Sequence, residues 1–135
     1  MAAMSDYLEV EIRKHLFRTG SFTKPAALYV ALFTAAPSDA GGGTEVTGGS
    51  YARVQRDPLD ANWTAPDGTG GLTDNAAVIT FPTATGSWGT VTHFAIFDAA
   101  TAGNMLLHGA LTVSKTVTSG DTFSFPVGNL DVTFA

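Results

Sequence analysis

The sequence predicts a mainly β protein: a single-domain antiparallel β-sandwich, jelly-roll-like, of about seven or eight strands, with one short N-terminal α-helix. Two observations carry this prediction. Short apolar runs recur along the chain and are separated by Gly- and Pro-rich turn segments. Two of these runs, joined by a short turn, have the pattern of a β-hairpin. The expected strands cover residues 25–33, 51–55, 76–81, 91–97, 105–117, 121–127 and 130–134.

The predicted hairpin lies between residues 91 and 113 and organises the rest of the chain. Val91–Phe97 and Met105–Val113 are apolar, and residues 98–104 between them are small and turn-forming. In the first arm, Phe94 and Ile96 alternate with Ala95 and Phe97, so both faces of the strand are apolar in its middle. A strand that is apolar on both faces is typically central and covered on both sides.

Residues 5–18 are the helix candidate. Leu8, Ile12 and Leu16 recur at helical spacing, and Ser5 or Asp6 can serve as the N-cap. Acidic residues come early and basic ones late, which suits the helix dipole. We expect this apolar stripe to pack on the protein's own sheet, with docking on a partner as the alternative. Residues 1–20 would then form a helical arm, and residues 21–135 the sandwich.

A long Gly-rich segment follows the first predicted strand. Residues 34–50 contain Pro37 and five glycines. Loops of this length are either functional or disordered. The Gly-Lys-Ser/Thr ending of a phosphate-binding loop is missing, so a nucleotide site is not predicted.

Composition and charge restrict the classes of function. The chain has 135 residues, no cysteine and a net charge of −5. An acidic chain without a basic stripe argues against nucleic-acid binding, and the absence of cysteine excludes thiol chemistry. There is no secretory signal pattern and no apolar run of membrane-spanning length, so we expect no membrane partner and synthesis in a host cytoplasm.

Catalytic and metal-binding patterns are weak. His93 and His108 lie in the two arms of the hairpin, with Asp98 nearby in sequence. A metal site normally needs a third ligand and second-shell support, so structural histidines are the favoured interpretation. We therefore predict no enzyme, no catalytic residues, no metal and no cofactor.

Three stretches resemble a known family. ALYVALFTAAPSDAGGGTEVTGGSYARV, ITFPTATGSWGTVTHFAIFDAATAGNMLLHGAL and SGDTFSFPVGNLDV are similar to small virion proteins of tailed bacteriophages, often labelled tail fibre proteins. The resemblance implies a structural component of the virion. It also implies partners: sister copies, as a homo-oligomer and often a trimer, and phage capsid or tail proteins.

Three functions follow as hypotheses. The first is a head decoration, or cement, protein that bridges capsid subunits as a homotrimer. The second is a tail fibre, adaptor or baseplate component. The third, from another class, is a carbohydrate-binding module with Trp63 or Trp88 as its stacking platform. For the first two, the candidate contact residues come from the helix and the Gly-rich loop: Tyr7, Leu8, Ile12, Leu16, Pro37, Gly42 and Val46.

Overall fold

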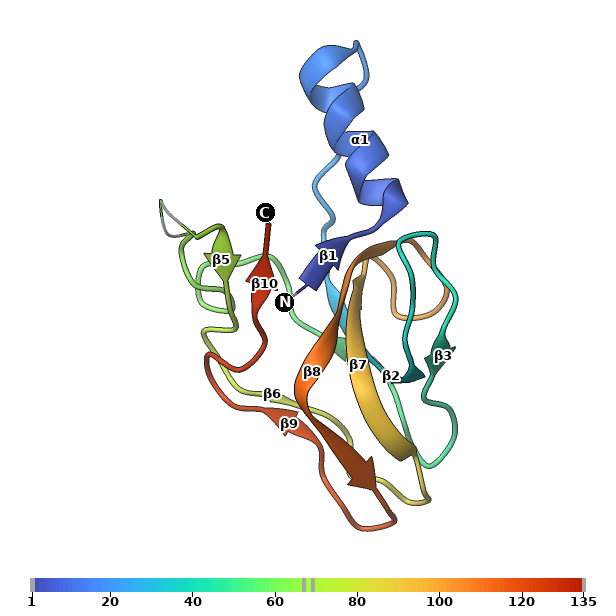
Figure 1. The fold of residues 1–135 in the computed structure, drawn as a ribbon. Helices are drawn as coiled ribbons and strands as arrows, with labels where there is room; N and C mark the ends of the chain where they lie inside the picture. Colours follow the sequence, from blue (N-terminus) through green and yellow to red (C-terminus); the bar gives the residue numbers. More distant parts are fainter. Residues whose placement is uncertain (1, 67, 69, 135) are drawn as a thin grey trace.

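The computed structural model describes residues 2–66, 68 and 70–134, and it is built mainly of β-strands (Figure 1). One helix, α1, spans Asp6–Phe17. The strands are β1 (Ala2–Met4), β2 (Tyr29–Ala35), β3 (Thr44–Glu45), β4 (Val54–Gln55), β5 (Leu72–Thr73), β6 (Ile79–Thr80), β7 (Gly89–Phe97), β8 (Met105–Val117), β9 (Ser124–Phe125) and β10 (Val132–Thr133). The predicted mainly β class with a short N-terminal helix is confirmed.

The largest layer is a six-stranded antiparallel sheet in the order β1-β8-β7-β2-β3, with β4 also pairing with β2. The predicted hairpin is confirmed, because β7 and β8 pair along most of their length. β7 has β8 on one side and β2 on the other, so it is an interior strand as its two apolar faces indicated. Val30 pairs with Ile96 and Leu32 with Phe94 in this central part of the sheet.

An irregularity in the β7–β8 ladder changes which side chains reach the core. Val91 pairs with Lys115, whereas His93 pairs with Ala110, so the register shifts between these two positions. A bulge of this kind changes the alternation of faces. The extra residues lie in β8, between Ala110 and Lys115. In β7, Val91, Phe94 and Ile96 all belong to one buried cluster, although strict alternation would separate Val91 from the other two.

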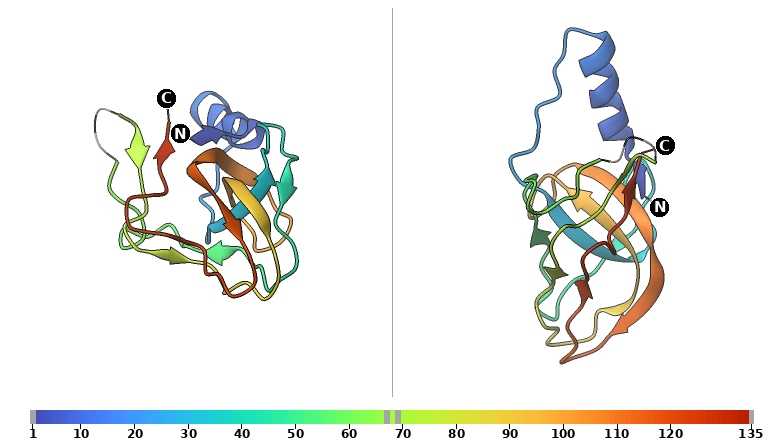
Figure 2. Two further views of the ribbon diagram at one scale, coloured as in Figure 1. Left: turned by 60° about the horizontal axis from the view of Figure 1, so that its bottom comes forward. Right: turned by 90° about the vertical axis from the view of Figure 1, so that its left-hand side faces the viewer.

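The second layer consists of two short ladders, β10-β5 and β6-β9, which pack against the large sheet (Figures 1 and 2). Their aromatic side chains fill the space between the layers. The rings of Phe81, Phe123 and Phe125 contact one another, and Phe125 meets Phe94 of β7 at 6.2 Å between ring centroids. The two layers with a shared apolar core form the predicted β-sandwich.

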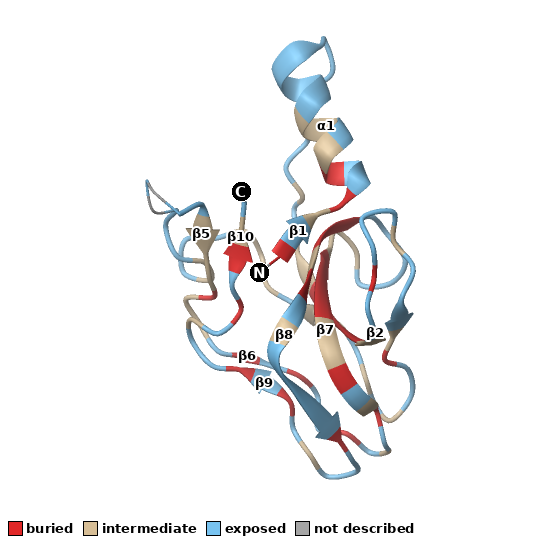
Figure 3. Cartoon of the chain, in the orientation of Figure 1, coloured by how far each residue is buried: buried red, intermediate tan, exposed pale blue. Residues whose placement is uncertain are grey.

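Helix α1 begins as predicted and then leaves the body of the protein. Ser5 is the N-cap: its hydroxyl oxygen accepts the Leu8 N–H at 3.2 Å. The Ser5 N–H donates to the carbonyl of Leu106, which fixes the start of the helix on β8. From there the helix projects beyond the sheet, and its far end is exposed (Figures 1 and 3). The strand β1 just before it was not predicted.

The Gly-rich segment is folded back on the sheet rather than open. Within it, β3 pairs with β2, and the Val46 N–H donates to the carbonyl of Leu32 at 3.0 Å. Gly43 has a positive φ of 75°, and a Cβ there would lie 2.7 Å from the backbone nitrogen of Pro37. Only glycine fits this close approach, so the composition that suggested a flexible loop instead permits a tight fold.

Candidate interaction site

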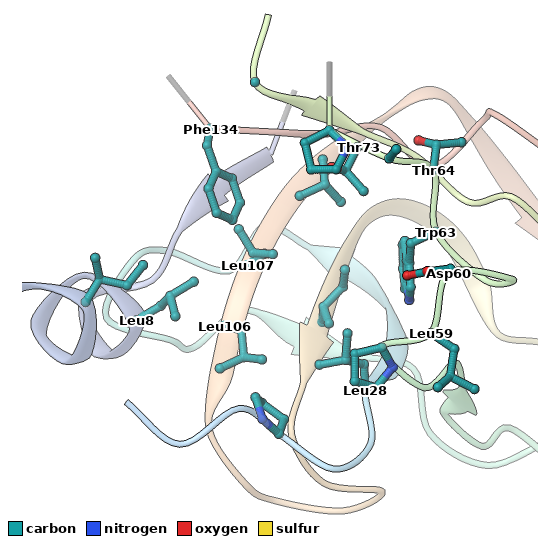
Figure 4. Close-up of a pocket in the computed structure, with 18 of the residues that line it drawn as sticks. Leu8, Leu28, Leu59, Asp60, Trp63, Thr64, Thr73, Leu106, Leu107 and Phe134 are labelled. Carbon is teal, nitrogen blue, oxygen red and sulfur yellow. The ribbon is translucent and has the colours of Figure 1, made fainter. Parts of the chain in front are cut away.

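A large groove opens between the two layers of the sandwich, at the end of the molecule that carries α1 (Figure 4). Its volume is about 820 Å³. The lining comes from segments far apart in sequence: the start of α1, the chain that enters β2, the loop before β5, and strands β7, β8 and β10. Its apolar members include Leu8, Ile12, Phe22, Leu28, Leu59, Trp63, Ile96, Leu106, Leu107, Val132 and Phe134.

Polar groups in the groove are few. Asp60 is the one carboxylate among its described lining residues, and Thr64 and Thr73 are the neutral polar ones. The Trp63 indole N–H donates to the Asp57 carbonyl at 3.2 Å, so its polar edge is already satisfied within the chain. Ligand recognition in this groove would therefore rest on apolar contact, with Asp60 as a charge at the rim.

The far end of α1 is the second unusual surface. We use the term helix tip for residues 13–18. Leu16 and Phe17 in this tip are 66% and 79% exposed. Large exposed apolar side chains that lie together are typical of interaction sites. The tip is also basic, since it contains Arg13, Lys14 and Arg18, of which Lys14 pairs with Glu11 at 2.8 Å.

Three of the four predicted helix candidates divide between these two surfaces, and Tyr7 belongs to neither. Leu8 is buried, and both Leu8 and Ile12 line the groove. Leu16 lies in the helix tip and Tyr7 is partly exposed near the helix start. The expectation that the whole stripe packs on the protein's own sheet is wrong at Leu16, because the helix has passed the edge of the sheet by that turn.

The predicted loop candidates also differ from one another. Val46 is 3% exposed and belongs to the central core cluster, and Pro37 is buried as well. Both side chains are covered by the chain itself, so neither offers a free surface. Gly42 is exposed with a positive φ of 79°. Of the three loop candidates, Gly42 alone lies where another protein can reach it.

The histidines of the hairpin have separate partners. His93 pairs in the ladder with Ala110, and its Nδ1 is 2.7 Å from the Thr92 hydroxyl. The His108 Nε2 lies 2.8 Å from the Asp39 carboxylate. Among the described residues, no group of three or more His, Asp or Glu side chains gathers as metal ligands would.

The strongest polar cluster is structural. The Glu45 carboxylate accepts hydrogen bonds from the Tyr51 hydroxyl and from Arg53, whose guanidinium also stacks on Phe97 at 3.7 Å. The Tyr51 oxygen in turn accepts the Leu32 N–H at 2.9 Å. Burial raises the pKa of Tyr51 well above its ordinary value. Arg53 also donates to the carbonyls of Ala99 and Ala102, so the cluster ties β2 and β3 to the turn between β7 and β8.

The two tryptophans differ in exposure. Trp88 is 4% exposed, and its indole N–H donates to the Gly49 carbonyl at 2.9 Å. It packs edge-on against Tyr51 in the core. Trp63 is half-buried on the wall of the groove (Figure 4). Trp88 is therefore a core residue, and Trp63 is the one tryptophan that an external partner can contact.

The sequence reasoning missed Phe17, Leu59 and Phe134 as surface candidates. Phe17 stood at the margin of the helical stripe, Leu59 in a turn-rich segment and Phe134 at the end of an alternating strand. No single stretch of sequence contains the groove, because its walls come together only in the fold. A large apolar residue beside basic ones at the end of the helix was the available signal for the tip.

Comparison with known proteins identifies the family. A family model described as podophage GP4 fiber I protein gp80 matches residues 3–133, which include every described element apart from the first residue of β1. No curated protein matches the chain. No helix among the described residues is long and apolar enough to cross a membrane. The resemblance to tailed-phage virion proteins is thus confirmed: the chain belongs to the podophage GP4 fiber I protein gp80 family and is a structural component of a bacteriophage virion.

Proposed function

We propose that this protein is a subunit of a tail fibre, in which the β-sandwich is the structural unit and the helix tip is an attachment point. The single observation that carries this proposal is the projection of α1, which holds Leu16 and Phe17 clear of the body at 66% and 79% exposure. The description of the matching family as a fibre protein supports the tail over the head. Its neighbours would be other virion proteins and sister copies.

A head decoration protein, the first hypothesis from the sequence, is the second candidate. A small β-sandwich with an exposed arm suits the bridging of capsid subunits as well as it suits a fibre. The exposed, basic helix tip would then contact the capsid surface. A homotrimer remains part of the proposal in either location, and the mass of the purified oligomer tests it.

A catalytic or glycan-binding role has less support. The hydrogen-bonding groups of the Tyr51, Glu45 and Arg53 cluster are used within the chain. Trp88 is buried, and the polar edge of Trp63 is bonded to a backbone carbonyl. We therefore propose a non-enzymatic protein without a cofactor, whose contacts are with proteins.

Labelling of intact virions tests the location. Gold-conjugated antibodies raised against the purified chain are applied to phage particles and examined by electron microscopy. We expect gold at the tail. Gold distributed over the head would overturn the fibre assignment in favour of decoration, and unlabelled particles that contain the protein only after disruption would overturn both.

A further inference from the structure

We propose that the helix tip of one copy docks in the apolar groove of a second copy, with Leu16 and Phe17 inserted and the basic side chains at the rim. The inference rests on the proposed function for its place in the virion, because a fibre or decoration subunit must join its neighbours. It goes beyond that function by naming both halves of the contact. The two halves are different surfaces of the same chain, so the contact is head-to-tail.

The tip cannot fill the groove of its own chain. Leu8 and Ile12 already line that groove from the start of the helix. At a rise of about 1.5 Å per residue, Phe17 lies about 13 Å farther along the helix axis than Leu8. The chain after the helix is tied back to it, since the Phe22 N–H donates to the Nδ1 of His15 at 3.2 Å. The exposed tip is therefore held away from its own body and available to another molecule.

The groove has the properties of a receptor for an apolar helix end. Leu106, Leu107 and Ile96 lie at its floor on the large sheet, while Leu59 and Phe134 remain 58% and 46% exposed beside it. A volume of about 820 Å³ lies in the range of ligand pockets, which is about 300–1,000 Å³. Helices commonly bind such grooves through a few large apolar anchors. Leu16 and Phe17 are two large, exposed apolar side chains at the end of such a helix.

Charge favours a second copy over an unrelated apolar segment. Residues 12–38 contain four Arg and Lys and no Asp or Glu, whereas residues 39–134 contain nine acidic residues against three basic ones. Arg13 and Arg18 have no ion-pair partner among the described residues. At the groove, Asp60 is the one described carboxylate, and Lys24 is bound to the nearby Pro58 carbonyl. A basic tip that approaches an acidic body is attracted, and its Arg13 or Arg18 meets Asp60.

Sedimentation velocity and light scattering on the full chain test the tip. Phe17→Glu places a charge at the inserted position, and Val113→Glu is its matched control, because Val113 is 77% exposed and lies away from both surfaces. We expect Phe17→Glu to weaken self-association by at least about tenfold and Val113→Glu to leave it unchanged. Equal association of both variants would overturn the proposal. So would a wild-type protein that stays monomeric up to about 1 mM.

A mixing experiment tests the head-to-tail pairing. Leu59→Lys adds a cation beside the groove and leaves the tip intact, whereas Phe17→Glu leaves the groove intact. Each variant alone is expected to be monomeric, and the 1:1 mixture is expected to form a dimer that grows no further. Absence of a mixed dimer, with wild type still associating, would overturn the proposal in favour of a different self-contact.

Both substituted side chains are exposed, so the variants are expected to fold, and circular dichroism with thermal melting checks this. If either variant melts early, Leu16→Glu and Ala65→Trp replace it on the tip and the groove side. The virion-labelling result does not enter this test. Self-docking in solution can therefore hold while the fibre location fails, and the reverse outcome is equally recognisable.

Discussion

At the scale of single residues, Asn75 organises the second layer of the sandwich. It is fully buried, and its side-chain amide donates to the carbonyls of Ala77, Phe125 and Pro126. Its side-chain oxygen accepts the N–H groups of Asn129 and Leu130. One side chain thus satisfies five backbone groups around β9 and the turn that follows it. Buried backbone groups without hydrogen-bond partners are costly. The Asn75 side chain therefore supplies the hydrogen bonds that neighbouring strands would supply in a longer ladder.

Asn75→Asp is expected to lower the free energy of unfolding by more than about 3 kcal/mol. One carboxylate oxygen can still accept the N–H groups of Asn129 and Leu130. The other replaces the amide donor, so it faces three carbonyl oxygens without a hydrogen to share. The carboxylate charge is also buried, which adds to the cost. Urea denaturation measures the change. Asn129→Asp, on an exposed side chain, is the matched control and is expected to cost less than about 0.5 kcal/mol. Equal losses at both positions would contradict this role.

Tyr51 is expected to make the stability of the protein depend on alkaline pH. Its pKa is raised by burial, so the folded state favours the neutral phenol more strongly than the unfolded chain does. The stability that follows is fully present below the unfolded pKa of about 10 and is lost as the pH rises above it. Tyr51→Phe removes the ionisable phenol and with it this dependence on pH. It also leaves the Leu32 N–H without its acceptor, which is expected to lower the free energy of unfolding by about 1–3 kcal/mol near neutral pH.

Thermal melts from pH 8 to 11 on wild type and Tyr51→Phe measure both effects. We expect the variant to melt lower at pH 8, and its melting temperature to fall less steeply above pH 10. Parallel curves across this range would show that another group governs alkaline unfolding.

At the scale of secondary-structure elements, β7 determines the core. Phe94 and Ile96 are 3% and 2% exposed and lie between the large sheet and the second layer. Phe94→Ala and Ile96→Ala are each expected to lower the free energy of unfolding by about 2–5 kcal/mol. Val113→Ala, on an exposed part of β8, is the control and is expected to cost less than about 0.5 kcal/mol. Losses below about 1 kcal/mol at both core positions would be incompatible with a central β7.

The same element shows what the sequence could predict. The β7–β8 hairpin was predictable because two long apolar runs flank a short turn, and a strand with two apolar faces has few places other than the middle of a sheet. β1, β3 and β5 were not predictable, since strands of two or three residues carry no periodic pattern. The partners of β1 and β5 are also distant in the chain, since β1 pairs with β8 and β5 with β10. β10 lies within the strand predicted over residues 130–134.

The candidate site was predictable only in part for the same reason. The apolar stripe of α1 marked Leu8, Ile12 and Leu16, but periodicity does not say where a helix passes the edge of its sheet. Residues at the same spacing therefore differ, with Leu8 at 6% and Leu16 at 66% exposure. Val46 was misjudged because a Gly-rich composition suggested an open loop, whereas the glycines allow that segment to fold against the core.

At the scale of the whole molecule, the N-terminal arm has two structurally different ends that its sequence does not separate. Its first residues belong to the large sheet: Ala2, Ala3 and Met4 pair with Gly109, His108 and Leu107 of β8. Ala2, Ser5 and Leu8 are buried. Leu16 and Phe17 in its last turn lie outside the core clusters and are exposed. The arm is thus anchored at one end and exposed at the other.

Deletion of residues 1–20 is therefore expected to damage the fold itself and not only the attachment. The deletion opens the edge of β8, which leaves unpaired backbone groups that promote aggregation. It also uncovers the groove floor, at about 25 cal/mol for each Å² of apolar surface returned to water. We expect a lower melting temperature and large particles by light scattering, whereas Phe17→Glu should melt like wild type. A truncated protein that stays monodisperse and melts unchanged would mean that the sheet closes without β1, and would limit the arm to docking alone.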